Sequence, residues 1–226
     1  MKKIMKKIIE IFRYLLGLPK TFYFNFKYFP IKIAIKIPVV VSHKVKFREL
    51  SGSVELGKIK CGIVRIGFGT IDSYEFGYTP TIFSNKGKII FDGKCKIGYG
   101  TAINNEGTIR FGENVNTSKI QVICREKIEI GKNSIIGWDC LIMDTDHHHI
   151  YDINMERVKI NNNKKILIEE HVWLGAKSTI LKGVTIGKNN IVAIGTTISK
   201  SILETNVIIG NTLELKKIKK DIKWKE

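Results

Sequence analysis

A six-residue period runs through most of this 226-residue chain and limits the folds that it can adopt. Between residues 97 and 198, isoleucine, leucine or valine recurs at every sixth position in three registers. Neither a helix, with its 3.6-residue period, nor an alternating antiparallel strand produces this spacing. A coil of three short strands does, because each hexapeptide then forms one side of a triangular prism. The positions are Ile97, Ile103, Ile109 and Val115; Ile130, Ile136 and Ile142; and Ile168, Leu174, Ile180, Ile186, Val192 and Ile198.

In such a coil each of these apolar side chains points inward and stacks on the residue 18 positions later, about 4.8 Å away. Ile168 is therefore expected under Ile186, and Leu174 under Val192. Glycine and small residues fall at the corners, where a bulky branched side chain would not fit. The pattern predicts an all-β fold, a parallel β-solenoid that occupies residues 56–211.

The registers also predict a segment that leaves the prism. Position 148 continues the series that ends at Ile142, but it lies 20 residues before Ile168, which is not a multiple of six. We therefore expect residues 149–163 to form a loop outside the coil. The period ends after Ile202, and the basic residues 212–226 are predicted to form a short helix that caps the stack.

Residues 1–55 have a different character, basic, amphipathic and aromatic. Twelve basic and two acidic residues among the first 50 contribute +10 to a net charge of +17. Apolar residues at three- and four-residue spacing predict an amphipathic helix over 1–17, which ends near Gly17, and alternating isoleucine and lysine predict a half-buried strand over 31–37. Two interpretations stay open: residues 1–40 contact an anionic membrane, or the helix caps the prism. No nucleic-acid-binding motif is present, so nucleic acid is not an expected partner.

Cysteine usage and the beginning of the chain bear on its compartment. The four cysteines form no C-x-x-C pair, which favours a reducing environment. Charged residues interrupt the first apolar segment, no small-residue cleavage site follows, and no 18-residue apolar run occurs. We therefore expect a cytoplasmic protein that is neither secreted nor integral to the membrane.

Three segments carry a more specific resemblance. DTDHHHIYD (144–152), HVWLGAKSTILKGVTIG (171–187) and AIGTTISK (193–200) resemble the hexapeptide-repeat O-acetyltransferases of the maltose and galactoside acetyltransferase type. Members that serve capsule, lipopolysaccharide and other surface-glycan pathways are the relatives that this resemblance leads us to expect. The resemblance covers roughly residues 60–211. It implies a left-handed β-helix, transfer of acetyl from acetyl-coenzyme A to a saccharide hydroxyl, and a homotrimer that holds coenzyme A between neighbouring prisms.

His148 matches the position of this family's catalytic histidine. A sugar hydroxyl attacks a thioester only after a base takes its proton, and imidazole side chains titrate near neutral pH. The register favours His148 over His147 and His149, because the side chains of these two neighbours point the other way on a strand. Asp144, Asp146 or a backbone carbonyl could orient the imidazole, and the sequence does not rank them.

The resemblance also implies the positions of the acceptor and thioester. Trp173 matches the tryptophan at the wall of the family's cleft. After Gly175, the backbone N–H of Ala176 is implied to face the thioester, where it would stabilise the tetrahedral oxyanion.

Coenzyme A contacts are implied farther along the chain. Ile194 and Gly195 match the backbone that pairs with the pantetheine amides, and Ser199 and Lys200 match the nucleotide end, where a cation suits the phosphates. The chain departs from the family pattern in two places: Lys182 stands where proline is usual, and GNTLEL (210–215) replaces Gly-Asn-Pro-Ala.

Two other functions remain open at this stage. The same base and co-substrate would serve N-acetylation of an amino sugar. A non-catalytic or metal-binding solenoid of the γ-carbonic-anhydrase kind would need more histidines, and beyond the cluster the chain has only His43 and His171. The D-x-D-H-H run is weak as a metal motif, so no metal is expected. Because no Cys-His arrangement or G-x-S-x-G occurs, direct transfer without a covalent acyl-enzyme is predicted.

Overall fold

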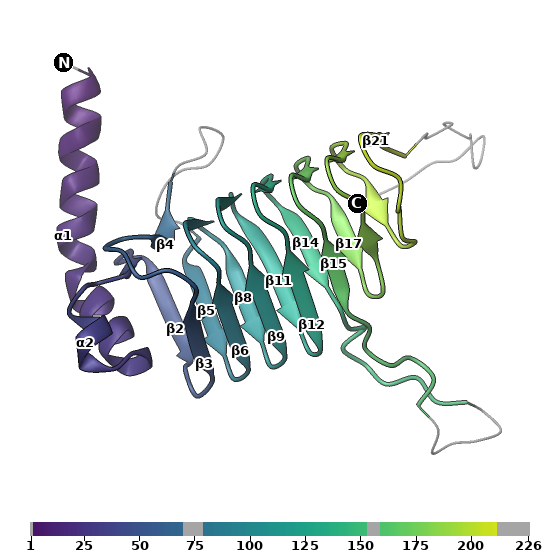
Figure 1. Ribbon diagram of the computed structural model, residues 1–226, viewed down its shortest axis with the longest axis horizontal. Coiled ribbons are helices and arrows are strands. Elements are labelled where there is room, and N and C mark those ends of the chain that lie inside the picture. Colours follow the sequence, from purple (N-terminus) through teal and green to yellow (C-terminus); the bar gives the residue numbers. More distant parts are fainter. Residues whose placement is uncertain (1, 70–78, 153–158, 212–226) are drawn as a thin grey trace, which may run out of the picture.

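The computed structural model describes residues 2–69, 79–152 and 159–211, with the backbone alone for residues 2–11. Within these residues the strands form three sheets, and every strand pairs in parallel with the strand one coil away. The chain passes from the first sheet to the second to the third and then begins the next coil, so the sheets are the sides of a triangular prism (Figure 1).

Each sheet contains one strand from every coil. The first sheet consists of β1 (Val39–Val41), β4 (Val64–Phe68), β7 (Cys95–Gly98), β10 (Val115–Thr117), β13 (Ile135–Ile136), β16 (Trp173–Leu174), β19 (Ile191–Val192) and β21 (Ile208–Ile209). The second consists of β2 (Val45–Glu49), β5 (Thr81–Asn85), β8 (Ala102–Asn105), β11 (Ile120–Cys124), β14 (Cys140–Met143), β17 (Thr179–Leu181) and β20 (Thr197–Ile198). The third consists of β3 (Ser53–Leu56), β6 (Lys88–Phe91), β9 (Thr108–Phe111), β12 (Lys127–Ile130), β15 (Ile166–Ile168) and β18 (Thr185–Ile186).

The stacking predicted from the six-residue period is confirmed in the last coils. Both expected pairs, 168 with 186 and 174 with 192, are Cα partners in the parallel ladders. Earlier coils are longer: Phe111 stacks on Phe91 and Ile128 on Ile109, so partners there lie more than 18 residues apart. Their strands have three to five residues, whereas those of the last coils have two or three, and each earlier turn therefore needs extra residues.

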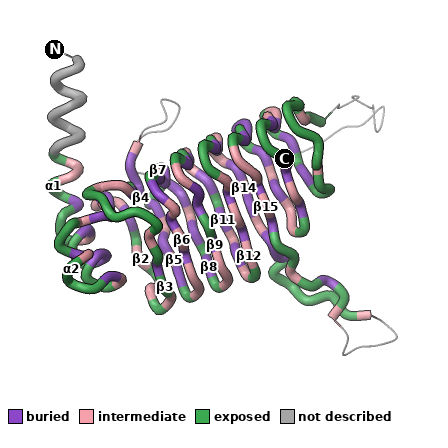
Figure 2. Tube along the Cα trace, viewed as in Figure 1, coloured by how far each residue is buried: buried purple, intermediate pink, exposed green. Residues whose placement is uncertain are grey.

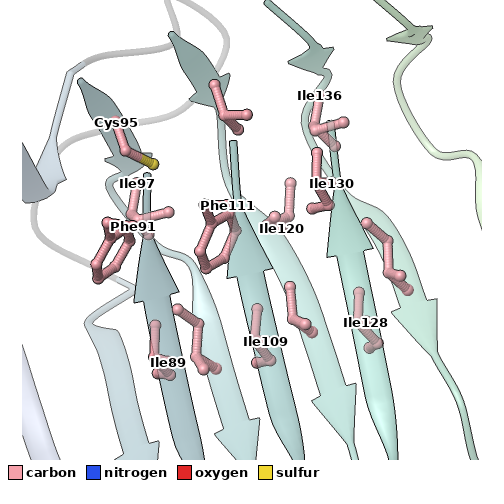
Figure 3. Close-up of a cluster of buried hydrophobic side chains, with 14 of the residues drawn as sticks. Ile89, Phe91, Cys95, Ile97, Ile109, Phe111, Ile120, Ile128, Ile130 and Ile136 are labelled. Carbon is pink, nitrogen blue, oxygen red and sulfur yellow. The ribbon is translucent and has the colours of Figure 1, made fainter. Parts of the chain in front are cut away.

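The core is a column of branched and aromatic side chains along the prism axis. Ile89, Ile109 and Ile128 lie one above another, and Phe91 stacks on Phe111 with ring centroids 5.3 Å apart (Figure 3). All five side chains are fully buried. Each contributes about 1.5–3 kcal/mol relative to an exposed position, so repetition of one apolar position per hexapeptide stabilises the whole stack.

The N-terminal segment corrects two predictions. The helix does not end at Gly17, because α1 runs from Lys2 to Tyr28. Gly17 lies where α1 crosses β1, and a Cβ atom there would be 2.4 Å from the carbonyl oxygen of Val41. Here glycine permits close packing of a helix on a strand and does not mark a helix end.

The strand predicted over 31–37 is also wrong. α2 (Ile31–Ala34) is a short helix that follows Pro30, and it leaves Ile31 and Ile35 exposed. The alternation of isoleucine and lysine therefore does not reflect one buried and one exposed strand face. The prism itself begins at Val39, inside the region expected to precede it.

α1 covers the first end of the prism (Figure 1). Asn25 and Thr21 are buried, and their side chains exchange hydrogen bonds with the backbone N–H and C=O groups of Val39 and Val41 at 2.6–3.2 Å. These are the edge groups of β1 that no further strand pairs with. The helix thus satisfies the open edge of the first sheet, which would otherwise expose unpaired backbone groups.

Between β14 and β15 the chain leaves the prism and returns (Figure 1). Its two arms pair through an antiparallel bridge between Tyr151 and Lys159, and Ile160 donates a backbone hydrogen bond to Ile150 at 2.9 Å. Residues 153–158 and the helix predicted over 212–226 lie outside the described residues. No helix in the described part of the chain is long and apolar enough to cross a bilayer.

Candidate active site

Asp144, the first residue after β14, anchors the base of the loop. Its carboxylate is fully buried and accepts backbone hydrogen bonds from Arg125, Glu126 and Lys127 at 2.7–2.8 Å. Those three residues form the turn one coil below. Burial, followed by the charge of Asp144, raises the pKa of the neighbouring Cys124 thiol. Asp144 therefore holds two turns together, and its oxygens are directed at the prism backbone.

Asp146 lies at the centre of a second set of contacts. Its carboxylate accepts hydrogen bonds from the Lys182 ammonium and from the Asn161 amide, the latter at 2.9 Å. The hydrogen bond from Lys182, followed by that from Asn161, lowers the pKa of Asp146. Lys182 also donates to the carbonyl of Asn162 at 3.1 Å, so one cation joins both arms of the loop to the next coil.

His148 lies within this network, with its backbone fixed and its side chain exposed. The backbone N–H of His148 donates to the carbonyl of Asp146 at 2.7 Å, and its backbone carbonyl accepts from the side-chain amide of Asn161 at 2.7 Å. Asn161 also accepts the N–H of Ile150 at 2.8 Å. A single amide thus fixes the chain on both sides of position 148 and leaves the imidazole facing solvent.

The flanking histidines have other surroundings. His147 adopts φ 63°, in the left-handed region, and its N–H donates to the hydroxyl of Thr145 at 3.1 Å. His149 packs edge-on against Tyr151. Because β14 ends at Met143, no strand continues to position 148. The expectation that His147 and His149 point away from His148 as strand neighbours is therefore wrong in its reason, although the three histidines do differ in environment.

A second group of predicted site residues lies at the corner between the first and second sheets. Trp173, in β16, is half exposed, while Gly175 and Ala176 are buried. A Cβ atom on Gly175 would lie 2.7 Å from the Ile194 nitrogen of the next coil, so only glycine permits this stacking. Within the described residues the Ala176 N–H donates no hydrogen bond, whereas its carbonyl accepts the N–H of Gly195 at 2.9 Å.

The remaining predicted cofactor residues follow on the next coil. Ile194 and Gly195 are exposed, Gly195 has φ 70°, and a Cβ atom at Gly195 would have no neighbouring atom within 4 Å. Ser199 and Lys200 are exposed after β20. The outer side of the chain at 194–195 is therefore accessible, although the Gly195 N–H already donates to Ala176.

Trp173 belongs to an apolar row on the outer face of the first sheet. It stacks between Ile135 and Ile191, and Ile208 follows on β21. Ile135, Trp173 and Ile208 are each at least half exposed. In the coils below, the same row contains Lys96 and Asn116, so only the last coils present an apolar face.

Within one chain the two groups of residues are separated. Ala176 precedes β17 and Lys182, which contacts the His148 loop, follows it. At about 3.3 Å per residue, the chain from Ala176 to Lys182 spans roughly 20 Å along one side of the prism. The structure therefore does not bring His148 together with Trp173, Ala176 or Gly195 in a single copy.

Other histidines lie away from this loop. His43 lies between β1 and β2 in the first coil, and burial lowers its pKa. His171 is exposed and contacts the side chain of Asn189 at 3.0 Å. Among the described residues no three metal-ligating side chains form a cluster. Cys140 is buried and contacts the carbonyl of Gly175 at 3.1 Å, which is a packing role.

Sequence reasoning missed Asn161 and the role of Lys182. Lys182 was visible as a departure from the family's proline, but its partner lies 36 residues earlier in the sequence. Nothing in the sequence distinguishes Asn161 from Asn162 and Asn163 beside it.

Comparison with known proteins agrees with the fold and the repeat. A family described as the hexapeptide repeat of succinyl-transferase matches residues 165–200. The structure of the polysialic-acid-specific acetyltransferase NeuO superimposes with a TM-score of 0.56 at 19% identity, covering 80% of this chain and 85% of that one. The chain therefore contains the hexapeptide repeat and has the fold of these acetyltransferases. The left-handed β-helix that the resemblance implied is confirmed.

Curated acetyltransferases match this chain over shorter segments. The galactoside O-acetyltransferase of Lactococcus lactis is 30% identical over 110 residues, which cover 48% of this chain and 52% of that protein. The polysialic acid O-acetyltransferase of Neisseria meningitidis is 41% identical over 70 residues, which cover 30% and 32%. The chain thus spans about half or less of the length of these relatives.

Proposed function

We propose that this protein transfers an acetyl group from acetyl-coenzyme A to a hydroxyl of a saccharide, with His148 as the general base. One observation supports this above all: the His148 imidazole is exposed at the base of a loop while hydrogen bonds fix its backbone on both sides. A base must be held in place and still reach its substrate. Relatives named as O-acetyltransferases of galactosides and polysialic acid support the reaction class.

The reaction needs no covalent enzyme intermediate. The acceptor hydroxyl loses its proton to His148 as its oxygen forms a bond to the thioester carbonyl carbon. The Ala176 N–H, which has no acceptor among the described residues, would hydrogen-bond the oxyanion that develops on the carbonyl oxygen. When the carbon–sulfur bond breaks, the electron pair leaves on sulfur, and the imidazolium returns its proton to the thiolate.

The active unit in this proposal is a homotrimer. His148 and Ala176 lie at different corners of one prism, so a complete site requires His148 of one copy and the corner at 173–200 of the next. The apolar row that includes Ile135, Trp173 and Ile208 suits burial between two copies. Coenzyme A would lie in the groove between them, along the accessible chain at Ile194 and Gly195, with its phosphates near Ser199 and Lys200.

The acceptor belongs to a surface-glycan pathway in this proposal. We place the enzyme in the cytoplasm, at the inner face of the membrane, where a lipid-linked saccharide would be available. The basic charge of residues 1–50 supports this location. Trp173 would line the acceptor side of the groove, since aromatic faces pack against sugar rings through their apolar C–H surface.

Thiol release from acetyl-coenzyme A tests the proposal directly. The purified chain is assayed against a panel of neutral, acidic and amino sugars, together with His148→Ala and His147→Ala. The proposal expects turnover with hydroxyl acceptors, a loss of at least a hundredfold in His148→Ala and near-normal turnover in His147→Ala. Acetylation confined to the amine of amino sugars would establish N-acetylation instead. No turnover together with no coenzyme A binding by calorimetry would overturn the enzymatic function.

A further inference from the structure

Helix α1 presents opposite faces to the prism and to solvent. Its inner face contains Gly17, Thr21, Phe24 and Asn25, which are buried against β1 and its neighbours. The hydrogen-bonding groups of the edge strand β1 point along the prism axis, and Thr21 and Asn25 occupy them. α1 therefore lies across the axis, and its opposite face points away from the end of the prism (Figure 1).

That outer face is apolar. Exposed residues recur at spacings of three and four along α1, and on a helical wheel they lie opposite Gly17 and Phe24. After α1, Figure 2 shows further exposed chain at α2, where Ile31 begins the helix and Ile35 directly follows it. The exposed residues of the outer face of α1, with the fraction of each apolar one exposed, are Phe12 59%, Leu15 56%, Leu16 46%, Phe22 43%, Tyr23 55% and Phe26 50%, together with Pro19; at α2, Ile31 is 70% and Ile35 62% exposed.

Cations border this face. Lys27 lies at the edge of the outer face on the helical wheel, whereas the Lys20 ammonium is directed at the prism, where it donates to the carbonyls of His43 and Val45. Lys27 is exposed, as are Lys32 and Lys36 beside the isoleucines of α2. No acidic residue occurs between Glu10 and Glu49. Aromatic and branched side chains bordered by lysine are the composition of a helix that lies in the plane of a membrane interface.

We propose that the outer face of α1 and α2 binds the surface of an anionic lipid bilayer, with α1 flat on the membrane and the prism axis along the membrane normal. Charge selects this occupant. A second copy docked through the same face would bring two strongly basic segments together, whereas anionic headgroups complement them. In a trimer with parallel prisms the three α1 helices share one plane, so three faces bind at once and avidity strengthens the contact.

This orientation sets the height of the candidate site and deepens the proposed function on which it rests. From β2 to β14 the second sheet rises by four strand spacings, roughly 19 Å at 4.8 Å each. The α1 layer adds about 10 Å. His148, just after β14, would therefore stand roughly 30 Å from the lipid surface. A lipid-linked acceptor would have to be an oligosaccharide or polysaccharide, because a single sugar on the lipid headgroup does not reach this height.

Co-sedimentation with vesicles tests the membrane surface. The full chain is mixed with phosphatidylcholine vesicles or with vesicles that also contain phosphatidylglycerol, at low and high salt. We expect binding to the anionic vesicles, weakened by salt, and at least a tenfold loss in Phe22→Glu/Phe26→Glu. The matched control Leu203→Glu/Val207→Glu adds the same charge at exposed apolar positions near the other end of the prism and should bind like wild type.

Three results would overturn the inference. The first is that the wild-type chain does not bind anionic vesicles, and the second is that the Phe22→Glu/Phe26→Glu variant binds them equally well. The third is that light scattering shows a changed oligomeric state in this variant, which would make this face a protein interface. Acetyl transfer to a soluble saccharide is measured in parallel. Because these substitutions lie far from His148, that activity should stay unchanged, so failure of lipid binding and failure of the proposed function give different results.

Discussion

Replacing Asp144 with asparagine tests whether this residue supports the fold or the catalytic base. In the structure one carboxylate oxygen accepts the Arg125 N–H at 2.7 Å and the other accepts the N–H groups of Glu126 and Lys127 at 2.8 Å. Asparagine keeps one acceptor oxygen and places an NH2 group against at least one buried N–H. Two donors facing each other leave that N–H unsatisfied.

The magnitude follows from these three contacts. An unsatisfied buried N–H costs about 1–3 kcal/mol, and each retained bond loses about 1 kcal/mol when the acceptor is no longer charged. Burying a neutral amide costs less free energy than burying a carboxylate, and this difference offsets part of the loss. We expect a net loss of about 2–4 kcal/mol in the free energy of unfolding, measured by urea titration with circular dichroism.

The control is Asp146→Asn, at a partly exposed carboxylate whose loss should change the unfolding free energy by less than about 1 kcal/mol. Asp144→Asn should retain acetyl transfer at a temperature where it stays folded, because its carboxylate is directed at the turn and not at the imidazole. A stable Asp144→Asn protein with a hundredfold loss of activity would refute this and assign Asp144 to orientation of His148.

Three further predictions concern the helix, the loop and the groove. Gly17→Ala should lower the free energy of unfolding, measured by urea titration, by about 2–3 kcal/mol. Displacing α1 weakens four hydrogen bonds of about 1 kcal/mol each, while helix propensity gains about 1 kcal/mol, and a raised free energy of unfolding would contradict this. Because the pKa of Asp146 is lowered, its stabilisation of the loop is complete above about pH 4 and is lost as the pH falls through the lowered pKa. Lys182→Met should raise the pKa of Asp146 toward its ordinary value, as measured by NMR of the carboxyl group. An unchanged titration would show that Lys182 is not the partner of Asp146. Lys200→Ala should raise KM for acetyl-coenzyme A about two- to fivefold with little change in kcat, and equal KM values would remove Lys200 from the groove.

The repeat made most of the prism predictable because the six-residue period encodes both strand and corner. One inward apolar side chain per hexapeptide suffices to place Ile168 under Ile186 without any knowledge of long-range contacts. A fixed period of 18 residues per coil does not predict the longer early coils, where Phe91 stacks on Phe111 although the two residues are not 18 apart.

The N-terminal segment was less predictable because its local signals have two meanings. Glycine ends many helices, yet here Gly17 permits a helix to approach the Val41 carbonyl. Only the position of the partner strand distinguishes the two roles. Ile31 and Ile35 alternate with lysine as in a strand, but Ile31 begins a short helix, Ile35 follows its end, and both are exposed. Tertiary contacts decided each case.

The choice of His148 stays a prediction, and the contacts that surround it were not predictable from the sequence. His148 could be selected by its place before the loop, whereas a carboxylate after a strand looks the same whether it anchors a turn, as Asp144 does, or pairs with a distant lysine, as Asp146 does. Asn161 fixes His148 from the returning arm of the loop, and no spacing in the sequence encodes that pairing.

Subunit mixing tests the central claim most directly, that His148 of one copy works with the corner at 173–200 of the next. His148→Ala removes the base, and Gly195→Trp blocks the groove, where no atom lies within 4 Å of the position of a side chain. Each variant alone should be inactive. Trimers unfolded and refolded together at equal amounts should regain about one quarter of wild-type acetyl transfer, because one interface in four then joins an intact base to an intact groove. Mixed trimers without activity would contradict a site shared between copies.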